Sequence, residues 1–151
     1  MGLFRPSSGQ ATHHRRRRGG STIELALLSP WILFLFVGTF DFGFYNYALI
    51  SLQSAARVAA LHTSTNASVA ADSAGACTYV LGELKDLPNV GSAMSSCSDP
   101  VTVTATAVNG PDGASASKVT VTYKTVLLIP IPGLLRNQFT FQATQIMRLR
   151  S

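Results

Sequence analysis

The chain has 151 residues and a formal net charge of +5, enough for one domain with a membrane anchor but not for two full domains. The positive charge is local, because five of the twelve basic residues precede Gly20 and the other seven are balanced by the seven acidic residues. No basic patch interleaved with aromatic side chains follows Gly20, so nucleic acid is not expected as a partner.

An apolar segment follows the basic residues. It reads LALLSPWILFLFVGTF from Leu25, and after Asp41 a second uncharged stretch reads FGFYNYALISLQSAA. A bilayer span requires about 20 largely apolar residues. We therefore expect a transmembrane helix from Ile23 to Tyr45, with Glu24 and Asp41 near its two interfaces, in contact with membrane lipid.

The charge distribution predicts the direction of this helix. Arg15 to Arg18 flank its N-terminal end, and no comparable cluster follows it closely. Basic residues remain on the cytoplasmic side, so the C-terminal two-thirds of the chain should be extracytoplasmic. A cleaved secretory signal fits poorly, because the apolar run is too long and Ala55-Ala56-Arg57 is a poor cleavage site. Nothing beyond the arginines supports a twin-arginine signal.

The start of the apolar segment resembles the processing signal of type IV-like prepilins, in which arginines and a glycine precede a glutamate and an apolar helix. The resemblance implies cleavage between Gly19 and Gly20, which makes Glu24 the fifth residue of the mature chain. Cleavage after Gly20 would make it the fourth. Leu25 departs from the pattern, because an aromatic residue usually follows the glutamate.

The resemblance extends downstream. GGSTIELALLSP and GTFDFGFYNYALISLQSAARVAALH are similar to the TadE-like family of pseudopilins from tight-adherence (Flp) pilus systems. This implies a minor pseudopilin in the cytoplasmic (inner) membrane, trimmed by a prepilin peptidase and acting with other pilins or pseudopilins and a membrane platform in pilus assembly, initiation and adhesion. The alternatives are an uncleaved signal-anchored envelope protein with an unrelated binding head, and a secreted protein released by ordinary signal peptidase.

Two carboxylates in the apolar segment are candidate assembly residues. A carboxylate in hydrocarbon is costly unless it is paired, so Glu24 would favour assembly with an amine, either its own or that of a neighbouring subunit. The alternative is that Glu24 simply reaches the interface. Asp41 either marks the outer membrane boundary or, as the resemblance implies, takes part in helix packing.

Beyond the span we expect the helix to continue to His62. Its small, apolar face suits bundling with other helices or packing on the rest of the chain; this face comprises Ala48, Leu52, Ala55, Ala59 and His62. A second helix should begin after the capping residue Asp72 and reach about Leu87, before Pro88. Its apolar face is predicted to comprise Ala74, Cys77, Val80, Leu81 and Leu84.

Cys77 and Cys97 are the two cysteines of the chain. They are either unrelated small core residues or a structural disulfide, which would need the oxidising environment expected outside the cytoplasm. The disulfide would pin the loop from Pro88 to Pro100 to the second helix and stabilise the fold by roughly 3 kcal/mol.

Three alternating segments predict strands: Val101 to Val108, Lys118 to Leu128, and residues 138–150, with a turn at Asn109 to Gly113. Strands that follow helices indicate an α+β fold with a small antiparallel sheet. The apolar segment Val126–Arg136 cannot pair throughout as a strand, because it contains two prolines. It is predicted either to cover the sheet edge or to touch a membrane or partner through residues such as Leu134 and Leu135.

The resulting organisation has three parts: a basic leader at residues 1–19, a transmembrane and continuing helix at residues 20–62, and an extracytoplasmic α+β head at residues 63–151. No catalytic set is evident. His13 and His14 lie in the leader, and His62 has no cysteine or carboxylate at a metal-ligand spacing. We therefore expect neither an enzyme nor a bound metal or cofactor.

Overall fold

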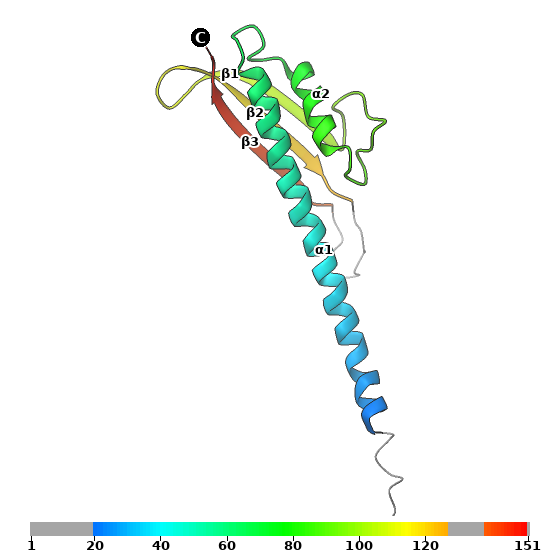
Figure 1. The fold of residues 1–151 in the computed structure, drawn as a ribbon. Coiled ribbons are helices and arrows are strands. Elements are labelled where there is room, and N and C mark those ends of the chain that lie inside the picture. Colours follow the sequence, from blue (N-terminus) through cyan, green and yellow to red (C-terminus); the bar gives the residue numbers. More distant parts are fainter. Residues whose placement is uncertain (1–19, 127–137, 151) are drawn as a thin grey trace, which may run out of the picture. The chain divides into compact units, whose positions relative to one another are not determined.

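The computed structural model describes residues 20–126 and 138–150. The chain forms, in order, α1 (Gly20–Thr63), α2 (Ser73–Leu84), β1 (Val101–Asn109), β2 (Ser115–Lys124) and β3 (Thr140–Arg148) (Figure 1). The long apolar N-terminal helix, the second helix and the antiparallel sheet confirm the predicted α+β class. The chain divides into two compact units, residues 1–39 and 40–151, and α1 contributes to both.

The first part of α1, residues 20–39, has large apolar side chains exposed all round the helix, including the consecutive residues Leu33, Phe34 and Leu35. A helix that is apolar on every side needs an apolar environment, and α1 is long and apolar enough to cross a membrane. Two of its hydroxyl groups are hydrogen-bonded within the helix: Ser29 donates to the carbonyl of Ala26 and Thr39 to that of Leu35. Internal hydrogen bonds of this kind remove the cost of placing a hydroxyl in hydrocarbon.

The second part of α1, from Phe40 to Thr63, belongs to the same unit as the sheet. Its predicted small face is buried, and the core residues of this part are Ala48, Leu52, Ala55, Ala56, Ala59 and Ala60. His62, predicted to complete the face, is partly exposed. Of the two roles proposed for this face, the structure uses it for packing within the unit.

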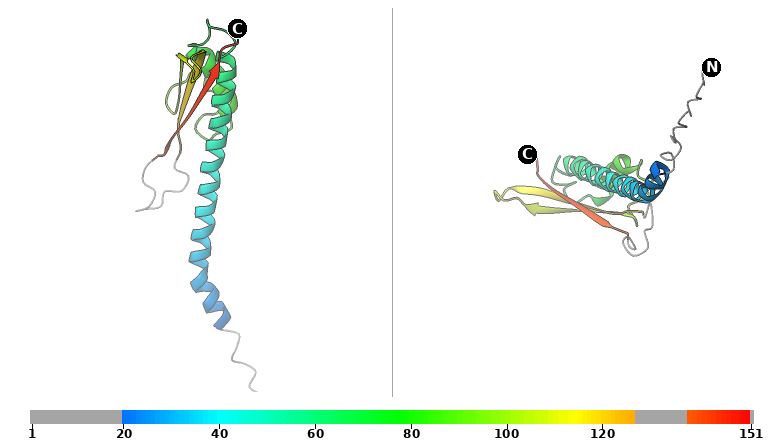
Figure 2. Two further views of the ribbon diagram at one scale, coloured as in Figure 1. Left: turned by 90° about the vertical axis from the view of Figure 1, so that its left-hand side faces the viewer. Right: turned by 90° about the horizontal axis from the view of Figure 1, so that it is seen from below.

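The three strands form one antiparallel sheet in the order β1-β2-β3, with continuous one-to-one register (Figure 2). Alternate residues of β2, namely Val119, Val121 and Tyr123, are fully buried in the core. The opposite face carries mainly threonines. In one row across the sheet Thr104 pairs with Thr120, which pairs with Thr144.

The second helix differs from the prediction at its end and on one position of its face. Asp72 caps α2 as expected, since its Oδ1 accepts a hydrogen bond from the amide of Gly75 at 2.9 Å. The helix ends at Leu84 rather than about Leu87. Ala74 is exposed and Ala76 is buried in its place, because Ala74 lies in the first turn at the margin of the apolar stripe.

The second strand begins at Ser115, three residues before the predicted Lys118. The turn is short, because the amide of Gly110 donates to the carbonyl of Ala114 at 2.7 Å and pairing starts at once. Ser117, which has no β-branched side chain, is buried. Its hydroxyl donates to the carbonyl of Ala70 and contacts Thr63 Oγ1. The strand ends at Lys124, so Thr125 and Val126, which were predicted to belong to it, lie beyond its end. Residues 127 and 128 of the predicted strand, and most of the Val126–Arg136 segment, lie outside the described residues.

Candidate processing and assembly site

The predicted processing site lies where α1 begins. Gly19 is outside the described residues, and Gly20 is the first residue of the helix. Gly20 is exposed, and among the described residues no neighbouring atom lies within 4 Å of the position that a Cβ would occupy there. Because glycine has no side chain and no described neighbour lies close, the backbone at Gly20 is accessible on this side.

Glu24 is an exposed residue of α1, four residues after Gly20. Residues at this spacing lie on one face of a helix, about 5.4 Å apart along its axis. None of the ion pairs formed by the described residues involves Glu24. An amine created at Gly20 would consequently share a helix face with a carboxylate that has no cation of its own in this part of the chain.

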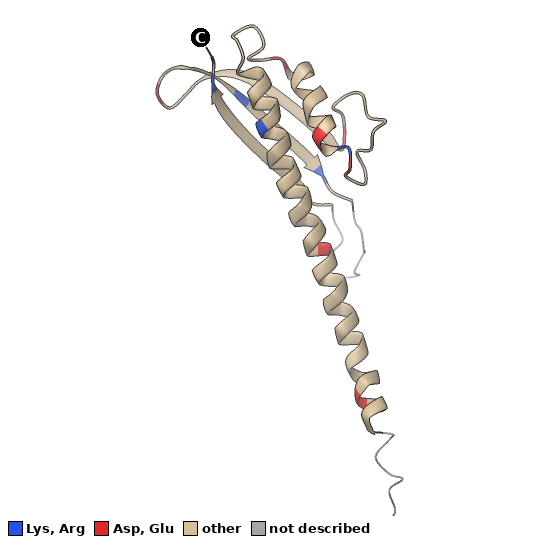
Figure 3. Cartoon of the chain, in the orientation of Figure 1, with Lys and Arg blue, Asp and Glu red and all other residues tan. Residues whose placement is uncertain are grey.

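Asp41 is placed differently from Glu24, because it is only 4 % exposed. Neither of its carboxylate oxygens has a hydrogen-bond partner among residues 20–126 and 138–150. A buried carboxylate without a partner loses its hydration and gains nothing in exchange. Charged residues are sparse along α1 as a whole, with only Glu24, Asp41 and Arg57 among residues 20–63 (Figure 3).

An aromatic cluster forms one helical turn beyond Asp41. The ring of Tyr45 lies edge-on to those of Phe139 and Phe141, with centroids 5.3 and 6.2 Å apart. Such edge-to-face pairs stabilise a contact beyond the apolar area that they bury. The sequence predicted Tyr45 as the last residue of the transmembrane helix, but it contained no signal for this contact with the start of β3.

The two cysteines are joined in a disulfide between Cys77 of α2 and Cys97 in the loop before β1, with Cα atoms 5.7 Å apart. Of the two interpretations left open by the sequence, the structure contains the disulfide. It ties the loop to the face of α2 that packs in the core. Its role is structural.

His62 contacts the N-terminal end of α2. Its Nε2 lies 3.8 Å from Asp72 Oδ2, and its ring lies 4.6 Å from that of Tyr79. Asp72 is already engaged as the helix cap, so this histidine supports the junction between the two helices. No group of three metal-ligating side chains occurs among the described residues.

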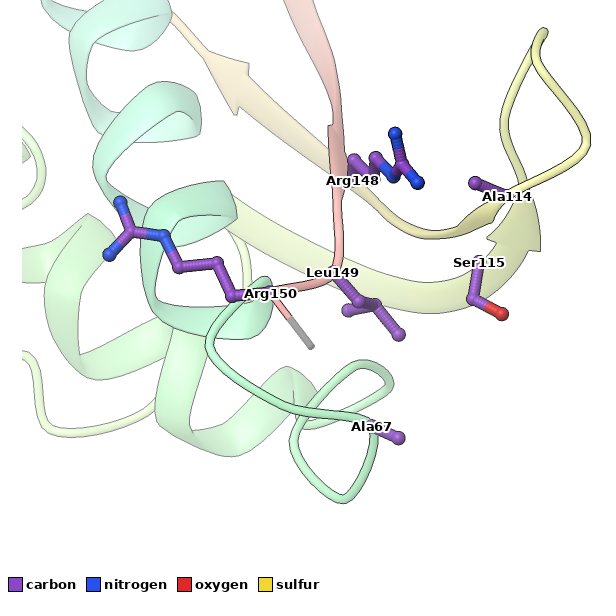
Figure 4. A pocket seen from close by; sticks show the side chains of 6 residues that line it. All are labelled: Ala67, Ala114, Ser115, Arg148, Leu149 and Arg150. Carbon is purple, nitrogen blue, oxygen red and sulfur yellow. The ribbon is translucent and has the colours of Figure 1, made fainter.

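A surface cavity of about 700 Å³ lies between the β1–β2 turn, the end of β3 and the loop after α1 (Figure 4). Its lining includes Arg148 and Arg150, whose side chains point in different directions. Arg148 faces Asp112 at 3.6 Å. The lining contains no nucleophile with an adjacent base, and so provides no catalytic arrangement.

Tyr123 is the most buried titratable side chain of the sheet. Burial raises the pKa of its hydroxyl to about 12. The hydroxyl donates a hydrogen bond to Asn89 Oδ1 at 2.6 Å, and Asn89 in turn donates to the carbonyl of Lys124 at 2.8 Å. This network fastens the loop after α2 to the end of β2 and is structural.

Residues 19–61 match the family model described as TadE-like protein. The match confirms the predicted resemblance over this segment, which contains Gly19, Gly20, Glu24 and Asp41. No curated protein matches the chain, and no solved structure matches it. The second helix and the sheet lie outside the matched residues.

Proposed function

We propose that this chain, through its TadE-like segment at residues 19–61, acts as a membrane-anchored minor pseudopilin of a tight-adherence pilus system. The observation that carries the proposal is a helix that begins at Gly20, presents Glu24 one turn later and continues as an exposed apolar surface. A prepilin signal requires this combination. The matched family model supplies the link to pili.

The first step of the proposed function is removal of the leader. A prepilin peptidase would hydrolyse the peptide bond between Gly19 and Gly20, releasing residues 1–19 and leaving an amine at Gly20 that is protonated at neutral pH. Glycines suit such a bond, because a peptidase can approach a backbone that has no side chains. Removal of the arginines also eliminates the charge that holds the N-terminus at the cytoplasmic surface.

The second step is assembly. The amine of Gly20 and the carboxylate of Glu24 would pair in the apolar environment, either within one chain or between neighbouring subunits. An unpaired carboxylate in hydrocarbon is unfavourable, so the pairing would draw a processed subunit to its neighbours. Other pilins or pseudopilins and the inner-membrane platform are the partners in this proposal, and adhesion is its outcome.

The third part is the orientation of the chain. The arginine cluster favours a cytoplasmic N-terminus, with the sheet, α2 and the disulfide outside the cytoplasm. The disulfide supports this assignment, because disulfides persist in oxidising compartments. In this proposal the chain crosses the membrane once.

The test is the N-terminal sequence and intact mass of the membrane-bound chain, produced with and without a tight-adherence prepilin peptidase. We expect a peptidase-dependent start at Gly20. Glu24→Gln separates processing from assembly: it should still be cleaved but should no longer crosslink to other pilus subunits. A chain that keeps its leader in the presence of active peptidase would contradict the proposal and favour the uncleaved signal-anchored alternative.

A further inference from the structure

The two edges of the sheet differ in how far the rest of the described chain covers them and bonds to their backbone groups. In β1 the amide of Val101 and that of Ala105 point away from β2, and both have partners. Val101 donates to the carbonyl of Ser98, and Ala105 donates to the hydroxyl of Ser73 at the start of α2. Because α2 packs against β1, this edge is partly covered.

The other edge belongs to β3, and its hydrogen bonds show which groups are free. The amide of Leu149 donates to the carbonyl of Ser115, and that of Thr125 donates to the carbonyl of Phe139. In an antiparallel pair such bonded residues alternate with unbonded ones. The odd-numbered residues of β3 therefore bond to β2, and the even-numbered residues direct their amides and carbonyls away from the sheet: Thr140, Gln142, Thr144, Ile146 and Arg148.

Within the part of the chain that the structure describes, this edge shows none of the features that usually prevent strand pairing. Natural edge strands carry lysines, prolines or bulges, or are covered by another element. From Thr140 to Met147 β3 contains no charged residue and no proline, and its register with β2 is unbroken. No hydrogen bond among the described residues engages the outward backbone groups of Thr140 to Arg148.

A cavity of about 350 Å³ lies along the same edge. It is lined by Leu49, Leu52 and Gln53 of α1 and by the four consecutive residues 142–145 of β3. Successive side chains of a strand point to opposite faces, so four in a row can line one cavity only along the edge of the strand. The free backbone groups therefore adjoin a cavity that has residues of α1 as one of its walls.

We propose that the free edge of β3 binds an extended segment of another polypeptide, which adds a fourth, antiparallel strand to the sheet. Backbone hydrogen bonds would supply the affinity, and alternate side chains the selectivity. The segment should be uncharged where it faces Thr140 to Met147. Toward α1 it should carry small or apolar side chains that fit beside Leu49 and Leu52.

A second copy of this chain is a poorer occupant than a different polypeptide. Two identical edges that pair antiparallel are related by a two-fold axis. Any helix that runs along one strand then runs in the opposite direction in the other copy. β3 and the Phe40–Thr63 part of α1 run in the same direction (Figures 1 and 2). The pairing would direct the two α1 helices oppositely, which disfavours it for chains inserted in one membrane; this step alone rests on the proposed function.

The test uses the full chain in its native membrane, with p-benzoylphenylalanine placed for photo-crosslinking at Gln142, Thr144 or Ile146 in turn. Thr120 is the control position, since it lies on the same outer face but in the central strand. We expect crosslinks from the β3 positions to one short segment of one partner. The crosslinked position should move back along that segment by about two residues for each step of two along β3.

Thr144→Pro and Thr144→Ala form the matched pair of variants. Both lose the hydroxyl, but only proline removes the outward amide, and edge strands tolerate proline where the amide faces away from the sheet. With the crosslinker at Gln142, we expect Thr144→Pro to lower the crosslink yield about tenfold and Thr144→Ala to leave it unchanged.

The stepwise shift of the crosslinked position along the partner segment, called the ladder below, keeps the proposal testable even if the proline variant does not fold. Crosslinks scattered over several partners, equal crosslinking from Thr120, or a ladder that maps to β3 of another copy would overturn it. So would full crosslinking by a folded Thr144→Pro chain. Cleavage of the leader is not part of this experiment, so failure of the ladder and failure of processing are distinguishable.

Discussion

The two parts of α1 form one continuous helix, but the first part exposes its apolar side chains and the second part buries one face. Residues 20–39 present leucine, isoleucine, phenylalanine and tryptophan on every side, and nearly all of these side chains are exposed. Residues 40–63 bury a stripe of alanines against the rest of their unit. The difference shows that a helix with large apolar side chains on every side suits a lipid environment. A helix with a stripe of small side chains suits close packing in a protein core.

The largest effect should come from charging the first part. We expect Leu33→Asp with Phe34→Asp to abolish membrane insertion, because each carboxylate near the centre of a span costs about 3 kcal/mol on insertion scales. The measurement is the fraction of chain that remains with membranes after alkaline extraction.

The matched control places the same two charges in the second part, as Ile50→Asp with Leu61→Asp. Both side chains are exposed there, and Ile50 is as exposed as many residues of the first part, at 68 %. We expect the control chain to remain in the membrane. If both double variants behaved alike, the functional distinction between the two parts of α1 would be wrong.

The disulfide should stabilise only the unit that contains the sheet. Cys77 and Cys97 are 20 residues apart, and closing a loop of this length stabilises a fold by roughly 3 kcal/mol. Reductant should therefore lower the denaturant midpoint of the full chain in mild detergent. Reductant should not affect the midpoint of the double variant Cys77→Ser, Cys97→Ser. It should also leave the membrane association of both chains unchanged. An equal response in the two chains would contradict this prediction.

Side-chain size provides a finer test. Ala55 is fully buried, so Ala55→Leu should overpack the contact of α1 with the core and destabilise the unit by about 2 kcal/mol. The control is the opposite change in the first part, Leu35→Ala, which removes an exposed side chain. Denaturant unfolding, followed by near-UV circular dichroism, should show a lower midpoint only for Ala55→Leu; a comparable loss in Leu35→Ala would mean that residues 20–39 pack against protein.

Much of this architecture was predictable because it rests on local patterns. The apolar run predicted the long helix, Asp72 predicted the start of α2, and alternation predicted three strands. The misjudged boundaries are those where tertiary contacts decide. Ser115 to Ser117 have little strand propensity, yet they join β2 because the short turn forces pairing and Ser117 finds buried hydrogen-bond partners.

The candidate site divides in the same way. Glycines followed by Glu24 form a linear motif, which a single sequence reveals directly. The contact of Tyr45 with Phe139 joins residues that are nearly a hundred positions apart, and no local pattern encodes it. The local sequence likewise gave no sign that Asp41 would be buried. The free edge of β3 was equally hidden, because strand order is a property of the folded sheet.

The smallest effect we expect is a pH dependence confined to the second unit. The pKa of Tyr123 is raised to about 12 in the folded chain, against an ordinary value near 10. A raised pKa means that the folded state holds the proton more tightly. The free energy of unfolding is thus fully retained below pH 10 and falls as the pH rises from about 10 to about 12.

Tyr123→Phe removes the titrating group and the hydrogen bond to Asn89 together. We expect this variant to be less stable than the parent at pH 8 but to lose less stability between pH 9 and pH 11, measured by chemical denaturation with the disulfide intact. Membrane association should not change over this range, because residues 20–39 contain no tyrosine. A parent chain whose stability falls no more steeply than that of Tyr123→Phe would show that the buried hydroxyl ionises as easily when folded as when unfolded. The network that holds the loop after α2 to the end of β2 would then be open to water, unlike the alanine-packed core beside it.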